Sequence, residues 1–378
     1  MFERKEKNAK NNIIVNFSLI FFLIGASFYI LYIGQSLIIP FIISILFSFA
    51  ILGLTRFYEK MKIPSVLAMI LSIFTYLFVF YYIGFIISSN INELIKLAPS
   101  YQIKLVGIFE NLTSYFGIDK NELDISGFLS KINLQNIFNS VFSALTSISS
   151  SIGTILFYTI FILLEAKYFS KKIELMIEDK EKRENILEVL NKIEKDVKGY
   201  FSIKVFVSFL TAMISYIIMI LFGLDFAIFW ALLIFVLNFI PNIGSIIAVL
   251  FPAFLSFIQP GFGIYTSIFM ITLLTTIQML VGNFIEPKLM GNKLNLSPLI
   301  IIISLSFWGY LWGIIGMLLS VPLMVIINII LSKFEQTRPI AIFLSEKGDL
   351  QVFGNGEFTD KKKIISDIKK KFKKKNKV

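Results

Sequence analysis

The sequence contains neither cysteine nor histidine. The chain therefore cannot form disulfides, thiolate or imidazole metal sites, Cys or His nucleophiles, or imidazole proton shuttles. Serine is abundant, but no histidine is available to act as its base, and no glycine-rich phosphate loop is present. We therefore expect no metal, no cofactor and no enzymatic activity, and the sequence argues against ATP as a direct source of energy.

Charged residues are scarce as well, at 16% of the chain, whereas apolar residues make up 56% and include 41 phenylalanines. Soluble proteins contain roughly 45–50% apolar residues. The charges cluster in a few stretches, and the apolar blocks between them are long enough to cross a hydrocarbon core of ~30 Å as helices. Backbone amides inside that core must be paired internally, and the alternation of barrel strands is missing. The predicted fold class is all-α, a polytopic integral membrane protein with about eight hydrophobic segments.

The charged and apolar stretches divide the chain into five regions. They are a basic N-terminus with three spans (1–87), an amphipathic helical region (88–150), a fourth span with a charged helical segment (151–204), a block of long apolar segments (205–334) and a polar tail (335–378). In the tail, Ile340–Leu344 and Leu350–Phe353 flank a Lys-Gly-Asp turn and predict a small β-hairpin. A polybasic end follows it.

The distribution of lysine and arginine predicts the orientation of the chain, because cytoplasmic loops carry an excess of these residues. Basic residues gather at the N-terminus, in segment 170–204 and in the tail, which places both termini in the cytoplasm and residues 88–150 outside. The formal net charge of +11 then indicates contact with anionic lipid head groups at the tail. The lysines are not accompanied by a nucleic-acid-binding motif, so we expect no nucleic-acid partner.

Two apolar segments, Phe226–Ile258 and Leu299–Leu331, are too long for a simple span. As continuous helices each would reach ~50 Å, well beyond the hydrocarbon core. Each has a break near its middle, so each is either one kinked, tilted span or a hairpin that returns to the side from which it entered. Lys288 and Lys293 lie between the two segments, and the positive-inside rule then favours two hairpins.

The first break carries the strongest candidate site, because polar groups at membrane depth are costly and often functional. Pro241 lacks an amide hydrogen, Asn238 and Asn242 flank it, and Gly244 permits close backbone approach. Together they can present carbonyl and amide groups to a solute or cation, as broken helices do in secondary transporters. The alternative is a packing kink capped by its own asparagines.

Two further groups are weaker candidates. Gly309, Gly313 and Gly316 mark the second break, where tight helix packing is an alternative to a gating role. Glu286 is a candidate coupling carboxylate at a membrane edge, although a solvated pair with the nearby Lys288 also explains it.

Two stretches resemble the AI-2E family, the autoinducer-2 exporters and permeases of the PerM type. Residues 229–244 are similar to a family signature that ends in Asn-Phe-Ile-Pro, two residues and Gly. The second stretch follows the family's spacing with Gln278, Asn283, Pro287, Gly291, Leu296, Pro298, Gly313, Gly316 and Pro322. Ser297 occupies a place where many members carry His, so a histidine-based proton role is not implied here.

The resemblance implies an eight-segment protein of the bacterial inner membrane that moves a small polar solute and forms a homo-oligomer, for instance a pentamer. Some relatives export the quorum-sensing signal autoinducer-2, and others exchange Na⁺ or Li⁺ for protons. The leading hypothesis is a gradient-driven secondary transporter whose path is lined by the breaks at 238–244 and 309–316, with Gln278, Asn283, Glu286 and Pro287 beside them. The alternatives are a monovalent cation/proton antiporter and a non-transporting membrane scaffold.

Overall fold

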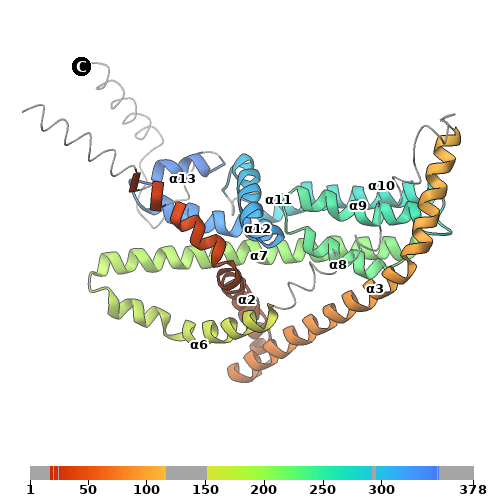
Figure 1. The fold of residues 1–378 in the computed structure, drawn as a ribbon. Coiled ribbons are helices and arrows are strands. Elements are labelled where there is room, and N and C mark those ends of the chain that lie inside the picture. The colour runs from red at the N-terminus through yellow and green to blue at the C-terminus, as the bar shows by residue number, and fades with distance from the viewer. Residues whose placement is uncertain are drawn as a thin grey trace, which may run out of the picture.

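The computed structural model describes residues 18–115 except 20 and 24, residues 151–291 and 295–346, and residue 348. Within these ranges every regular element is a helix (Figure 1), as predicted. In chain order the helices are α2 (Gln35–Lys60), α3 (Ser65–Tyr115), α6 (Ile152–Met176), α7 (Lys180–Phe222), α8 (Ala227–Leu237), α9 (Ile243–Ile258), α10 (Ile264–Leu280), the π-helix η1 (Val281–Ile285), α11 (Glu286–Met290), α12 (Pro298–Lys333) and α13 (Arg338–Leu344).

The predicted polytopic membrane fold is confirmed by the lengths and composition of these helices. Five of them are long and apolar enough to cross a membrane: α2, α3, α7, α10 with its continuation to Met290, and α12. Helix α6 is a sixth if its two parts, which meet at an angle of 61°, form one span. Shorter apolar helices are Phe21–Ile33, α8 and α9.

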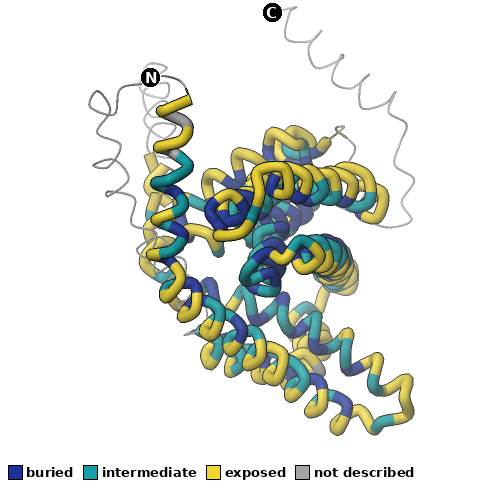
Figure 2. The backbone as a smooth tube through the Cα atoms, turned by 90° about the vertical axis from the view of Figure 1, so that its right-hand side faces the viewer, coloured by how far each residue is buried: buried dark blue, intermediate teal, exposed yellow. Residues whose placement is uncertain are grey.

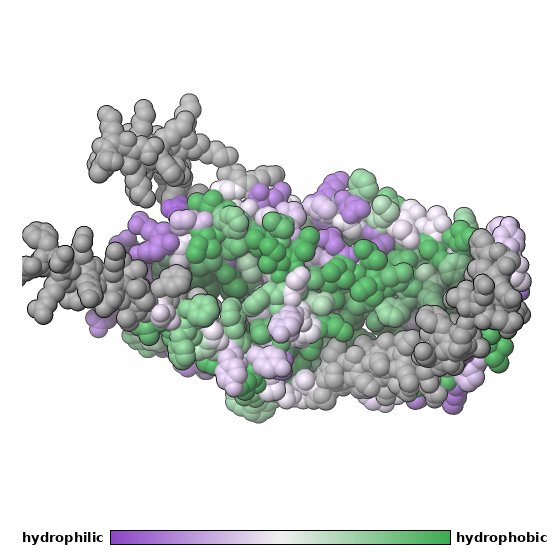
Figure 3. Space-filling view, turned by 45° about the horizontal axis from the view of Figure 1, so that its top comes forward, coloured by the Kyte–Doolittle hydropathy of each residue, from purple (hydrophilic) through white to green (hydrophobic). Residues whose placement is uncertain are grey.

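Much of the outer surface is apolar, as a membrane environment requires. The helices bury one side against each other and expose the other (Figure 2). On α3 the exposed side carries large apolar side chains such as Phe74, Phe78 and Phe85. Hydrophobic residues cover a broad area of the described surface in Figure 3. Exposed apolar surface of this extent is rare on soluble monomers, whereas lipid covers it without cost.

Two helices continue through boundaries that the sequence analysis placed between regions. Helix α3 does not end near residue 87 but runs to Tyr115. Its second half is amphipathic, as predicted, with a buried stripe at helical spacing formed by Ile91, Leu94, Ala98, Tyr101 and Leu105. Residues 116–150 of the predicted outer region lie outside the described residues. Helix α7 likewise crosses the boundary at 204/205, because Val197, Tyr200, Lys204 and Val207 continue one buried stripe.

The predicted first strand of the tail is wrong. Residues 340–344 belong to helix α13, which has Pro339 in its first turn, a position that favours helix initiation. Ala341 is completely buried, and α13 packs against α12. Tertiary packing therefore overrides the strand preference of the isoleucines. The predicted second strand, 350–353, lies outside the described residues.

The first overlong segment is a hairpin formed by α8 and α9. Its two ends meet, because the Gln259 side chain accepts a hydrogen bond from the Asp225 amide (2.8 Å) and donates one to the Gly223 carbonyl (2.9 Å). At the tip, the helices approach so closely that a Cβ on Gly244 would lie 1.8 Å from the Leu237 carbonyl oxygen. Only glycine fits there, which explains why the break ends in this residue.

The second overlong segment, α12, is also a hairpin. The chain reverses at Gly313, whose φ of 63° and ψ of −145° lie outside the helical region. The Ser304 hydroxyl donates to the Ser320 carbonyl (3.2 Å), so the two arms lie side by side. A Cβ on Gly316 would lie 1.9 Å from the Trp308 carbonyl oxygen. Of the two interpretations left open by the sequence, the structure has the hairpin in both segments.

The bases of the two hairpins lie at opposite ends of α7. The base of the α8–α9 hairpin adjoins Gly223, where α7 ends. The base of the α12 hairpin adjoins the charged start of α7, where Lys333 donates to Asn185 (2.9 Å) and forms an ion pair with Glu188 (3.8 Å). The hairpins therefore enter the helix bundle from opposite directions.

Candidate functional site

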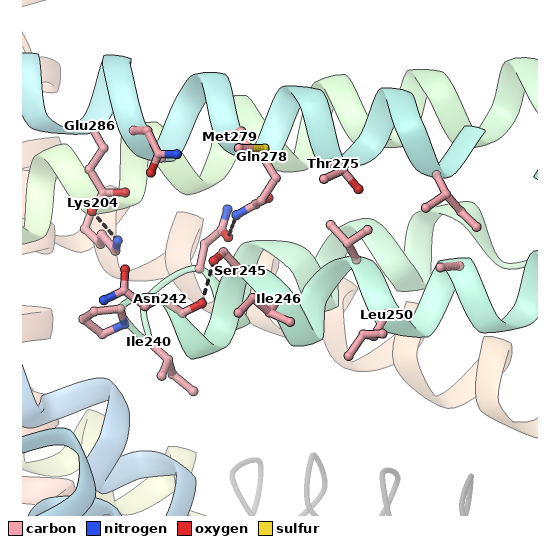
Figure 4. A pocket seen from close by; sticks show the side chains of 17 residues that line it. Lys204, Ile240, Asn242, Ser245, Ile246, Leu250, Thr275, Gln278, Met279 and Glu286 are labelled. Atoms are coloured by element: carbon pink, nitrogen blue, oxygen red, sulfur yellow. Dashed lines mark hydrogen bonds and ion pairs between the residues drawn. The ribbon is translucent and has the colours of Figure 1, made fainter. Parts of the chain in front are cut away.

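A cavity of about 400 Å³ lies beside the tip of the α8–α9 hairpin. Figure 4 shows it between the hairpin, helix α10 and the middle of α7. Gln278 and Thr275 reach it from α10, Asn242 and Ser245 come from the tip and the start of α9, and Lys204 comes from α7. Apolar side chains of α9 and α10, such as Ile246, form the rest of its wall. The cavity thus has a polar end at the hairpin tip and an apolar end farther along α9.

The tip is held in shape by its own backbone. The Gly244 amide donates to the Ile240 carbonyl (3.2 Å), and the Ser245 hydroxyl donates to the Asn242 carbonyl (2.7 Å). Asn242 has a φ of 59°, which is unusual for a residue other than glycine and is best tolerated by Asn and Asp. Such backbone conformations persist where the surrounding structure enforces them, and they cluster at functional sites.

The tip asparagines do not cap their own hairpin, which was the structural alternative to a binding role. Asn238, 7% exposed, accepts a hydrogen bond from Gln278 of α10 (2.6 Å between Oδ1 and Nε2). Asn242 ends the break without a side-chain cap bond to α9 and is exposed to the cavity. One asparagine therefore ties the hairpin to α10, while the other leaves its amide group available to a solute.

An ion pair between Lys204 and Glu286 forms the charged end of the cavity. The Lys204 side chain is 5% exposed and the Glu286 side chain 23%. Glu286 directly follows the π-helix Val281–Ile285. A π-helix inserts one residue into a helix and thereby rotates the residues that follow it, and such insertions are frequent at functional sites. The interpretation of Glu286 as a solvated partner of Lys288 is therefore wrong, because its partner comes from α7.

Two buried hydroxyl groups lie next to Lys204 along α7. Tyr200 precedes it by one helical turn and Ser208 follows it by one turn, and both residues are buried. Among the described residues neither hydroxyl has a hydrogen-bond partner. Buried hydroxyl groups are normally satisfied by protein or by water. The surroundings of Lys204 therefore have unused hydrogen-bonding capacity.

The predicted site residues divide into two groups. The cavity is lined by Asn238, Pro241, Asn242, Gln278, Asn283 and Glu286. It is not lined by Gly244, Pro287, Gly309, Gly313 and Gly316. Gly244 supports the tip from inside the hairpin, and Pro287 lies in the first turn of α11. The three glycines of the second break shape the α12 hairpin, so the structure does not bring the two predicted breaks to one cavity.

Sequence reasoning missed Lys204, which lies at the end of a strongly charged segment and was grouped with it. A signal was present, because Tyr200, Lys204 and Ser208 recur at a spacing of one helical turn where the charged segment meets the apolar one. Residues four apart share a helix face. A lysine on the same face as apolar and hydroxyl side chains, at the start of a span, predicts a buried partner.

Comparisons with known proteins find related transport proteins. The sequence model described as AI-2E family transporter matches residues 17–336. A relative in Escherichia coli, the AI-2 transport protein TqsA, is 29% identical over 320 residues, which cover 83% of this chain and 90% of TqsA. A candidate transport protein of Borreliella burgdorferi is 33% identical over 317 residues, covering 82% of this chain and 85% of the relative.

A third relative, a candidate transport protein of Haemophilus influenzae, is 30% identical over 331 residues, which cover 84% of this chain and 92% of the relative. The match to the family model runs through the spans, both hairpins and the residues around the cavity. The family model and the relatives are all described as transport proteins. The chain, a multi-pass membrane protein with two hairpins, therefore belongs to the AI-2E family of transporters.

Proposed function

We propose that the protein is a gradient-driven secondary transporter that exports a small polar solute, with autoinducer-2 as the candidate substrate. The observation that carries this proposal is the cavity itself, in which a strained hairpin tip, four amide side chains and a partly buried ion pair meet. Amide groups offer both donors and acceptors, which suits a solute rich in hydroxyl groups. A gradient is the proposed source of energy because the sequence has no phosphate-binding loop.

The hairpin explains how a polar site can exist in an apolar bundle. Its helices leave and return on the same side, so the tip is an irregular backbone segment held inside protein. Irregular backbone is tolerated at membrane depth where it lines a cavity, and broken helices of this kind form the binding sites of secondary transporters. The name of the E. coli relative supports autoinducer-2 as the solute.

The experiment that tests the proposal is uptake of autoinducer-2 into everted membrane vesicles containing the protein. Asn238→Leu and Asn242→Leu should each abolish uptake while the protein still inserts and elutes as a single species in detergent. Asn90→Leu is a matched control, because its amide group donates to the Ile86 carbonyl of its own helix (2.8 Å) and does not line the cavity. Full uptake by both cavity variants would contradict the proposal.

A non-transporting scaffold makes the opposite prediction in the same strains. It requires that both asparagine variants keep the cellular phenotype and that removal of residues 361–377 abolishes it. Transport depends on the cavity, whereas a scaffold depends on the surfaces that contact lipid or other proteins.

Exchange of Na⁺ or Li⁺ for protons is a second candidate function, and one observation favours it. Glu286 is a carboxylate at the end of the cavity, held by a buried lysine. A carboxylate that alternately binds a proton and a cation would meet the needs of an antiporter. Adding Na⁺ or Li⁺ to everted vesicles should then collapse a preformed pH gradient, and Glu286→Gln should lose this response. An unchanged response in that variant would exclude the role.

A further inference from the structure

Among the residues that the structure describes, a single cationic and a single anionic side chain line the cavity. These are Lys204 and Glu286, and they neutralise one another in an ion pair. The other lining residues are asparagine, glutamine, serine, threonine, glycine, proline and apolar residues. The lining is therefore polar at one end and carries no net charge.

The pair is fixed in place. Lys204 is 4% exposed and lies between the buried residues Tyr200 and Ser208 along α7. Glu286 is carried by the short helix that follows η1, and α11 packs against α7. Lys204 is buried and Glu286 is only partly exposed, so neither group can turn away from the other without leaving a charge uncompensated at a position with little access to water. A solute that enters the cavity therefore meets a paired charge.

This arrangement treats neutral and charged solutes differently. A neutral polar solute exchanges its hydrogen bonds to water for bonds to the amide groups of Asn242, Asn283 and Gln278. A charged solute must also give up its hydration, yet the described lining offers it no unpaired side chain of opposite charge. To gain one it must separate Lys204 from Glu286, which leaves either the buried lysine or the partly buried glutamate unpaired.

We infer that the Lys204–Glu286 pair is a charge filter that makes the cavity select uncharged, hydroxyl-rich solutes. The inference rests on the proposed function, since it concerns which solute the transport cavity accepts. It assigns to the two residues a role in specificity rather than in driving transport. It also makes opposite predictions for the removal of either partner, because each leaves behind a charge of a different sign.

Lys204→Met leaves the Glu286 carboxylate without its counter-ion, and the cavity should then favour a cationic solute. Glu286→Gln leaves the Lys204 ammonium alone, and the cavity should then favour an anionic one. The double variant Lys204→Met/Glu286→Gln has no charge in the lining and should again favour the neutral solute. If the ion pair only holds α7 against α11, removing either partner should lower the uptake rates of all solutes by the same factor. The ranking of the solutes by uptake rate would then not change.

The test uses three probes with the same five-carbon skeleton: xylitol, 1-amino-1-deoxyxylitol and xylonate. Uptake of each labelled probe is measured in proteoliposomes with equal potassium on both sides and valinomycin present, so that no membrane potential biases the charged probes. We expect wild-type protein to take up xylitol about thirtyfold faster than either charged probe, the lower end of the scale set by the loss of one buried charge partner. Lys204→Met should take up 1-amino-1-deoxyxylitol fastest, and Glu286→Gln should take up xylonate fastest.

A single variant that leaves one charge unpaired can fold poorly, so two further proteins test whether the wild-type order of uptake rates persists when no charge is left unpaired. The exchanged pair Lys204→Glu/Glu286→Lys retains both charges and should keep the wild-type order, as should the uncharged double variant. Glu188→Gln is a matched control, because it removes a different ion pair of α7, that with Lys333, far from the cavity.

The outcomes separate this inference from the proposed function. A reversed order in the single variants, or a wild-type order in both double variants together with reversal in one single variant, supports the filter. If every single variant that folds keeps the wild-type order of uptake rates, the filter is overturned. It is also overturned if either double variant changes that order, or if wild-type protein takes up none of the probes. If autoinducer-2 uptake still depends on Asn238 and Asn242 in that case, the proposed function stands and only the filter is lost.

Discussion

The α8–α9 hairpin and the α12 hairpin are built in the same way but end differently. Each folds an overlong apolar segment back on itself, and in each a glycine lies against a backbone carbonyl of the opposite arm. The first tip contains Asn238, Pro241 and Asn242 and borders the cavity. The second tip contains Trp308 and Trp312, whose rings lie 4.8 Å apart between centroids within an apolar cluster.

The comparison separates two requirements, the residues that let a helix break and reverse and the residues that let the break bind a solute. A break requires glycine or proline where the chain reverses, whatever its surroundings. A binding site also requires polar side chains that are not used up in stabilising the tip. In the first hairpin Asn242 meets this condition. In the second, the indole of Trp312 donates to the Leu31 carbonyl (3.0 Å), so its polar group serves to attach the tip to the N-terminal apolar helix.

The largest expected effect tests what the hairpins share. Gly244→Ala and Gly316→Ala each place a Cβ within 2 Å of a carbonyl oxygen, at 1.8 and 1.9 Å. Backbone must move to relieve the contact, and we expect a loss of about 3 kcal/mol or more in the free energy of unfolding. The measurement is the yield of monodisperse protein in detergent and its temperature of half-aggregation.

Gly53→Ala is the matched control for both changes, since a Cβ at that position of α2 meets nothing within 4 Å. It should leave the yield unchanged. If Gly244→Ala or Gly316→Ala gives the same yield as Gly53→Ala, the two hairpins are not built alike. The hairpin that accepts its alanine can then open at its tip.

The second prediction concerns what the hairpins do not share. Gln278→Leu leaves the Oδ1 atom of Asn238 without its hydrogen bond from α10. Transport of autoinducer-2 should fall strongly, because the tip is no longer held against α10, while the stability of the protein falls by about 1–2 kcal/mol.

A double-mutant cycle makes this prediction specific to the pair. Asn238→Leu/Gln278→Leu should be more stable than the sum of the single effects predicts, with a coupling energy of about 1 kcal/mol. Unfolding in mixed detergent micelles gives the three free-energy differences. Additive effects would show that Asn238 and Gln278 act independently, and the tie between the hairpin and α10 would then have to lie elsewhere.

The sequence allowed both hairpins to be predicted because their signal is local. An apolar run that exceeds the membrane thickness and contains Pro241 or Gly313 near its middle has few ways to remain in the hydrocarbon core. The positive-inside rule then favoured hairpins over full crossings through only two lysines, Lys288 and Lys293. The polar residues of the first tip were recognised for the same reason, since their cost at membrane depth is visible in the sequence.

The partner of Glu286 was not predictable in this way. Lys204 is 82 residues away in the chain, and the nearby Lys288 offered a simpler explanation. The ion pair depends on how α10 returns along α7 and on the rotation introduced by the π-helix, both of which are tertiary features. The continuity of α3 and α7 was missed for a related reason. In α7 the charge of Lys204, and in α3 the polar residues after Ile87, were interpreted as the end of a span, although a long helix can leave the membrane without a break.

The smallest expected effect comes from the tip of the second hairpin. Trp312→Phe removes the hydrogen bond from the indole to the Leu31 carbonyl but keeps an aromatic ring beside Trp308. We expect a loss of about 1 kcal/mol in the free energy of unfolding and no change in autoinducer-2 uptake, because this tip does not line the cavity. The informative comparison is with Gln278→Leu, which has a similar cost in stability but should lose transport. If Trp312→Phe also loses transport while it remains folded, the second tip takes part in the transport cycle, and the contrast between a functional and a structural hairpin does not hold.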